Sequence, residues 1–244
     1  MINKIIVLLI LMMVCAPLSS ARIIWKGIAS RQVALTFDDG PSPGVTDKIL
    51  EILKKEKVKA NFFVIGRKAE KNPDLLRRIA EGGHEIGNHS YNHSRTSWIN
   101  EKKLQKEVRR TSELISSITG LPVFLFRPPY GKIDRHKRKL LEKQGYNIIL
   151  WSIGADDCYR EGRGIRPPKS IIWRVVSRVR GGDIVLLHDN SRQIVEALPG
   201  MIKQLKRKGY VFAKISELNQ AGRKKKILSN KSSDLTAFST ITEN

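Results

Sequence analysis

The chain of 244 residues is long enough for one domain of barrel or sandwich size, and an apolar fraction of 41% is enough to bury a full core. A formal net charge of +22 is compatible with anionic partners such as nucleic acid, anionic lipid or acidic wall polymers. The basic residues are spread over most predicted helices and no base-reading motif accompanies them, so we expect solvated helix faces and no nucleic-acid partner.

The first 21 residues have the pattern of a signal peptide. Lys4 supplies a positive charge, Ile5–Val14 form an apolar stretch, and Ser19–Ala21 provide a small-residue cleavage site. We predict export, a secreted or cell-envelope location (periplasm or cell wall), and no stable membrane span after cleavage. A retained membrane anchor is the alternative, although the apolar run is shorter than the ~20 residues that span a bilayer. Cleavage would leave Cys158 as the one cysteine, so no internal disulfide is expected.

Short apolar segments then alternate with longer amphipathic stretches. The predicted strands are Gln32–Phe37, Ala60–Ile65, His84–Asn88, Val123–Phe126, Asn147–Trp151, Asp183–Leu187 and Tyr210–Ala213. Between them, Thr46 and Asn100 are each expected to cap a helix, and a third helix is expected to begin at Pro73 and end at Gly82. This alternation predicts an α/β fold whose parallel sheet closes, or nearly closes, into a barrel. An open doubly wound sheet is the alternative, but no Gly-rich dinucleotide fingerprint follows the first strand.

We assign residues 22–220 to this single domain. After it the hydrophobic pattern stops, and Arg223–Lys226 are followed by a stretch rich in Ser, Thr and Asn. Residues 221–244 are therefore predicted to form a basic, polar, disordered tail.

Polar side chains occur where the predicted strands end. These residues are Asp38, Asp39, His89, Arg127, Asp157 and His188. In parallel α/β barrels the carboxyl ends of the strands form one rim, and that rim bears the active site. We therefore predict a single site at the C-terminal strand ends.

A metal ion could be held by Asp39, His89 and His93, since one carboxylate and two imidazoles are common ligands of a catalytic zinc with one position left for water. The two histidines are one helical turn apart in spacing, so both can face one ion if the segment turns. Separately, these motifs also fit a strand-to-turn junction and two surface histidines. Together they favour a metal-assisted hydrolase with Asp38 free to act as a base. Zn²⁺ suits the ligands, and Co²⁺ or Ni²⁺ could occupy the same site.

Two further residues are candidates for the chemistry. Arg127 could form a bidentate pair with Asp38 and fix its rotamer, or it could be a surface arginine before a proline turn. His188 ends an apolar strand, where a lone histidine is often a satisfied core residue, but a place beside a metal site favours a general acid. Asp157 could hydrogen-bond His188 and raise its pKa, which would keep it protonated.

The motifs also carry a resemblance. In order they are Thr36–Gly40, His89–His93, Arg127–Tyr130, Trp151–Asp157 and Leu186–His188. Over residues 32–218 the chain resembles polysaccharide deacetylases of the NodB-homology type, carbohydrate esterase family 4. The resemblance implies a distorted (β/α) barrel with about seven parallel strands and the active site at their C-terminal ends.

The resemblance implies roles for individual residues. Asp39, His89 and His93 would bind the metal, with Asp38 as the base. Arg127 would orient that base.

On the other side of the site, the Tyr130 backbone N–H would help stabilise the oxyanion, and Leu186 would line the pocket for the acetyl methyl group. His188 would be the acid, tuned by Asp157.

The family's fourth motif usually reads Asp-x-x-Asp-Trp. In this chain, Gly154 and Cys158 replace the first and last residues of that motif. The missing indole removes a bulky wall of the cleft and leaves substrate preference open.

The activity implied is removal of N-acetyl groups from the amino sugars of a polysaccharide, either peptidoglycan or a chitin-like polymer. One alternative is an O-acetyl esterase acting on xylan-like glycans. Another is a non-catalytic, basic wall-binding protein on the same fold. The expected partner is the N-acetylated polysaccharide, and we expect a monomer.

Overall fold

The computed structural model describes residues 23–28, 31–158, 164 and 166–218. The predicted signal peptide and the predicted tail lie outside these residues and stay predictions. In the described part of the chain, no helix has the length and apolar character needed to cross a membrane.

Nine strands and seven α-helices are found in the described residues. The strands are β1 Ile23–Ile24, β2 Gln32–Asp38, β3 Asn61–Val64, β4 Glu85–Asn88, β5 Leu125–Phe126, β6 Asn147–Ile149, β7 Ile153–Gly154, β8 Ile184–His188 and β9 Val211–Phe212. The helices are α1 Thr46–Lys55, α2 Gly66–Lys71, α3 Pro73–Glu81, α4 Glu101–Thr119, α5 Arg135–Lys143, α6 Pro168–Val176 and α7 Arg192–Arg207. Two 3₁₀ turns are η1 Thr96–Trp98 and η2 Pro129–Gly131.

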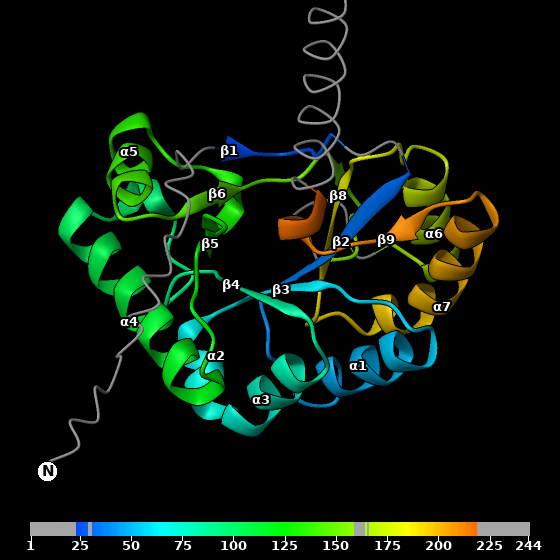
Figure 1. Ribbon diagram of the computed structural model, residues 1–244, viewed down its shortest axis with the longest axis horizontal. Coiled ribbons are helices and arrows are strands. Elements are labelled where there is room, and N and C mark those ends of the chain that lie inside the picture. Colours follow the sequence, from blue (N-terminus) through cyan, green and yellow to red (C-terminus); the bar gives the residue numbers. More distant parts are fainter. Residues whose placement is uncertain (1–22, 29–30, 159–163, 165, 219–244) are drawn as a thin grey trace, which may run out of the picture.

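All strand pairs are parallel, in the order β1-β6-β5-β4-β3-β2-β8-β7, and β9 pairs with the start of β2. The chain itself links β7, at one end of this order, to β6, which lies next to β1 at the other end, because only residues 150–152 separate β6 from β7. The Leu150 N–H donates to the Ile24 carbonyl on one side, and the Ser152 N–H donates to the Ile184 carbonyl on the other. The sheet is thus barrel-like, with helices around it (Figure 1).

The predicted distorted (β/α) barrel is confirmed, and each of the seven predicted strands has a counterpart. The additional strands β1 and β7 are two residues long. Such short segments have no hydrophobic period of their own, so they can be found only through the partners that they pair with.

Strand β2 shows how the barrel brings polar groups to its interior. Its odd-numbered apolar side chains pack in the larger core cluster, which includes residues of α1 and α7. Ala34 packs instead with Phe63 and Ile149, in a cluster to which six different strands contribute. Successive side chains of a strand point to opposite faces, so Thr36 and Asp38 share the inward face with Ala34.

The helix starts agree with the sequence at two positions and differ at one. Asn100 caps α4 by accepting a hydrogen bond from the Lys103 N–H at 2.9 Å, and Pro73 occupies the first turn of α3. The predicted cap at Thr46 is wrong, because Thr46 already lies inside α1. Its hydroxyl instead donates to Asp189 Oδ2 at 2.8 Å, a partner 143 residues away.

Candidate metal centre and active site

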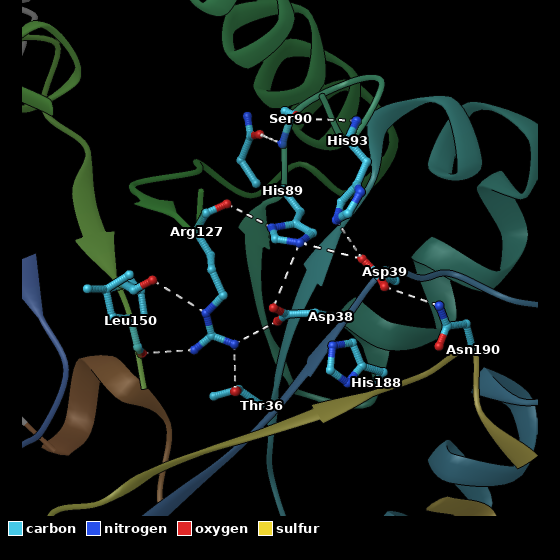
Figure 2. A network of polar contacts seen from close by, with 12 residues as sticks. Thr36, Asp38, Asp39, His89, Ser90, His93, Arg127, Leu150, His188 and Asn190 are labelled. Atoms are coloured by element: carbon cyan, nitrogen blue, oxygen red, sulfur yellow. Dashed lines mark hydrogen bonds and ion pairs between the residues drawn. The ribbon is translucent and has the colours of Figure 1, made fainter. Parts of the chain in front are cut away.

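The carboxyl ends of the central strands meet at one rim, where the side chains they position face one another (Figure 2). Asp38 lies opposite His188 in the β2–β8 pair. His89 directly follows β4, and Arg127 directly follows β5. The structure therefore brings together side chains that are 150 residues apart in the sequence, between Asp38 and His188.

Three residues are placed to hold one metal ion. Asp39, His89 and His93 each offer a ligand atom, and these atoms lie within 4.8 Å of one another. Asp39 Oδ1 is 3.1 Å from His93 Nε2 and 3.5 Å from His89 Nε2, but neither contact has hydrogen-bond geometry. A buried carboxylate oxygen without a donor is costly. A divalent cation among the three ligands would satisfy it, so this donor set fits Zn²⁺.

His89 is held in the orientation that a metal ligand needs. Its Nδ1 lies 2.7 Å from the Arg127 carbonyl oxygen. Since a carbonyl can only accept, Nδ1 carries the proton in the neutral ring, and Nε2 is left as the lone-pair nitrogen facing the two carboxylates (Figure 2).

His93 reaches the same centre through an irregular turn. Ser90 and His93 both have positive φ, 60° and 61°. The Ser90 N–H donates to Asn88 Oδ1 at 2.8 Å, and the His93 N–H donates to Ser90 Oγ at 3.0 Å. The segment between the two histidines therefore turns, as their spacing requires if both are to face one ion, and the turn brings their ring centroids to 4.9 Å.

A buried carboxylate that the sequence analysis did not identify supports this turn. Glu107 of α4 accepts hydrogen bonds from the backbone N–H and the side-chain amide of Asn92, at 3.1 and 3.2 Å. It is only 5% exposed. An acidic residue on the buried stripe of α4, between Leu104 and Val108, is the sequence signal that could have revealed it.

Arg127 is fully buried inside the barrel. Its Nη1 donates to Asp38 Oδ1 at 2.6 Å and to Thr36 Oγ1 at 2.7 Å, while Nη2 donates to the Leu150 carbonyl at 3.1 Å. The guanidinium also lies 4.0 Å from the Phe63 ring centroid. The predicted bidentate pair is wrong, because a single nitrogen serves Asp38 and the backbone engages the other. The contacts nevertheless hold the Asp38 carboxylate in one rotamer.

The predicted contact between Asp157 and His188 is present. Asp157 is fully buried, and it accepts from the His188 backbone N–H at 2.7 Å and from ring Nδ1 at 2.9 Å. Burial alone would lower the pKa of His188, but the hydrogen bond and charge of Asp157, with a smaller effect of Cys158, raise that pKa well above its usual value. The buried Asp157 carboxylate therefore favours the protonated form of the His188 imidazole.

The charges at the centre favour a cation. Burial alone would lower the pKa of His89, but Asp38 and Asp39 raise it above its usual value. Burial alone would raise the pKa of Asp39, but contacts with His89 and His93 hold it well below its usual range. Asp39 is thus ionised at neutral pH. A metal ion would replace the protons that the two imidazoles otherwise bind because the carboxylates are close to them.

The remaining predicted residues lie at the same rim. Tyr130 is half exposed in η2 with a φ of 61°, and its ring centroid is 4.8 Å from that of His93. Leu186 is buried in β8, opposite Thr36 of β2. The roles expected for the Tyr130 N–H and for the Leu186 side chain stay predictions.

Two residues directly after His188 also belong to the centre and were not predicted. Asn190 donates from Nδ2 to Asp39 Oδ2 at 3.1 Å (Figure 2). Asp189 is fully buried next to Gly40, where an added Cβ would overlap its carboxylate. Burial and the nearby Asp39 and Asp38 carboxylates raise the pKa of Asp189 to about 7, against the opposing effects of the Thr46 hydrogen bond and Lys68. The sequence signal that could have identified Asp189 and Asn190 is their position directly after an apolar strand.

Comparison with known proteins identifies the family of this chain. A family model described as polysaccharide deacetylase matches residues 27–149. A peptidoglycan-N-acetylglucosamine deacetylase of Bacillus cereus is 39% identical, over 76% of this chain and 87% of the relative. The chain belongs to the polysaccharide deacetylase family. Other relatives in Bacillus subtilis are named peptidoglycan-N-acetylmuramic acid deacetylases.

Solved structures give the same assignment. A peptidoglycan N-acetylglucosamine deacetylase superposes with a TM-score of 0.77 at 34% identity, covering 82% of this chain and 94% of that one. A protein of Bacillus anthracis described as a pseudoenzyme of carbohydrate esterase family 4 has a TM-score of 0.75 at 32% identity, covering 82% and 69%. The family fold therefore occurs with and without activity, and an activity has to be argued from the side chains.

Proposed function

We propose that this protein is an exported, metal-dependent deacetylase that removes N-acetyl groups from the amino sugars of peptidoglycan. The observation that carries the proposal is the meeting of a metal-ligand set, a carboxylate and a protonated histidine at one rim. Family membership and the peptidoglycan deacetylases among its relatives support the substrate class.

In this proposal Asp39, His89 and His93 hold the metal ion, with Zn²⁺ preferred and Co²⁺ or Ni²⁺ able to use the same ligands. A divalent ion held by these residues would supply a Lewis acid for the acetyl carbonyl and would make a bound water molecule more acidic. The lone-pair Nε2 of His89 and the unsatisfied Oδ1 of Asp39 support this assignment.

The protein's own groups move the protons. Asp38 accepts a proton from the attacking water, and its ion pair with Arg127 keeps the carboxylate aimed at the centre. The Tyr130 N–H donates to the developing oxyanion, while Leu186 lines the space for the acetyl methyl group.

His188 donates a proton to the amine as it leaves. The buried Asp157 carboxylate keeps that imidazole protonated until then. The products are acetate and a free amino sugar.

Acetate release tests the proposal. The protein is incubated with peptidoglycan, chitooligosaccharides and acetylxylan, each with and without a chelator. Metal-dependent release from peptidoglycan supports the proposal. Release from acetylxylan alone would identify an O-acetyl esterase, and binding to cell wall without release from any substrate would identify a non-catalytic wall-binding protein.

A further inference from the structure

An exposed surface beside the metal centre has no part in the proton transfers. Trp98 is 76% exposed and Tyr130 is 51% exposed. The guanidinium of Arg95 lies over both rings, 4.9 Å from the Trp98 centroid and 4.5 Å from the Tyr130 centroid. We call these three residues the aromatic platform.

The platform adjoins the reacting groups. The ring centroids of Tyr130 and His93 are 4.8 Å apart, and His93 in turn approaches Asp39. A polymer whose acetyl group lies at the metal centre would therefore have its neighbouring sugar near the platform.

The surrounding chain holds the platform in place. The Thr96 hydroxyl donates to the Lys132 carbonyl and so ties η1 to the segment after η2. Thr96 and Ile99 are buried on either side of the exposed Trp98. Tyr130 adopts a left-handed backbone conformation that non-glycine residues rarely occupy. Such conformations gather at functional sites, and an aromatic side chain left in water forgoes the free energy of burial.

The chemistry of the platform suits a charged glycan. Aromatic faces can receive the C–H face of a sugar ring, and a guanidinium stacked by its plane keeps its N–H edges available for a carboxylate. Within the described residues, no hydrogen bond or ion pair engages the Arg95 side chain, which is exposed. Peptidoglycan carries carboxylates on its lactyl-linked peptides, whereas chitin-like polymers carry none.

We propose that the aromatic platform binds the sugar next to the one that loses its acetyl group, and that Arg95 pairs with a carboxylate of the peptidoglycan strand. This inference rests on the proposed function and names the feature that makes peptidoglycan the preferred substrate.

Two variants and one control test it. Trp98→Ala should lower kcat/KM about 10-fold on both peptidoglycan strands and chitooligosaccharides of equal length, the size of effect expected for an aromatic anchor. Arg95→Gln should lower it about 10-fold on peptidoglycan alone, and less at high salt. Trp173→Ala is the control, because it removes an indole that is 65% exposed on α6. It should leave kcat/KM unchanged on both substrates. Platform variants that match the Trp173→Ala control would overturn the proposal, and an equal loss on both substrates in Arg95→Gln would overturn the carboxylate contact.

A binding measurement separates this inference from the proposed activity. Co-sedimentation with insoluble peptidoglycan is measured in an Asp38→Asn background, where turnover does not contribute. Trp98→Ala and Arg95→Gln should each weaken binding about 10-fold. If the wild type released no acetate while both variants lost binding, the activity would be wrong and the platform would stand. Unchanged binding in both variants would refute the platform even if acetate were released.

Discussion

Replacing Arg127 by Met should be one of the most destabilising single changes in this protein. The Arg127 side chain is fully buried, and that of Asp38 is only 5% exposed. Loss of the guanidinium leaves a buried carboxylate without its counter-charge and the Leu150 carbonyl without its donor. Breaking a buried ion pair from one side costs about 3–5 kcal/mol. That is a large fraction of the about 5–15 kcal/mol that stabilises a typical domain.

The assay is urea unfolding in the presence of a chelator, so that metal binding does not add to the measured stability. Arg110→Met is the control, because its ion pair with Glu70 is about half exposed and should contribute little to stability. Combining Arg127→Met with Asp38→Asn should recover part of the loss, since no unpaired charge then stays buried. A loss in Arg127→Met no larger than in the control would refute the view that this pair is buried and holds Asp38 in place.

Three other outcomes are expected. Asp38→Asn should keep its metal but lose roughly 10²-fold or more in kcat, and near-normal turnover would exclude it as the base. Asp157→Asn should shift the alkaline limb of the pH–rate profile to lower pH, because Asp157 raises the pKa of His188; an unmoved limb would point to another acid. Burial, with nearby lysines, lowers the pKa of His84 from 6.5 to about 4. The stability of the fold should therefore be highest above pH 6.5, where His84 is neutral in both states, and should fall as the pH drops toward 4. Urea unfolding should show this loss, about 3 kcal/mol, in the wild type and not in His84→Gln, and equal pH slopes would contradict it.

The barrel could be predicted from the sequence where strands are buried on both faces. Such strands produce continuous apolar runs, as in β2 and β8, and these runs are visible without a structure. The two-residue strands β1 and β7 depend entirely on their partners. Thr46 was misassigned for a similar reason, because its hydroxyl bonds to Asp189 rather than to the neighbouring helix.

The site was predictable to the extent that its chemistry demands particular residue types at strand ends. A carboxylate and two imidazoles could be proposed as metal ligands from type and position alone, and the structure brings the three side chains together. The supporting groups could not, since Glu107 acts on a turn 15 residues away and Asp189 packs against Gly40 from the turn after β8. Likewise, the single-nitrogen contact of Arg127 with Asp38 depends on where the Leu150 carbonyl lies.

The most direct test of the account is a zinc titration in which bound metal and acetate release are measured on the same preparation. Protein stripped by a chelator is titrated with Zn²⁺ in the presence of peptidoglycan. Acetate release should rise in proportion to bound metal until each chain holds one ion at Asp39, His89 and His93. His89→Ala should show neither binding nor release over the same range. Full activity in a preparation with no detectable metal would contradict the account.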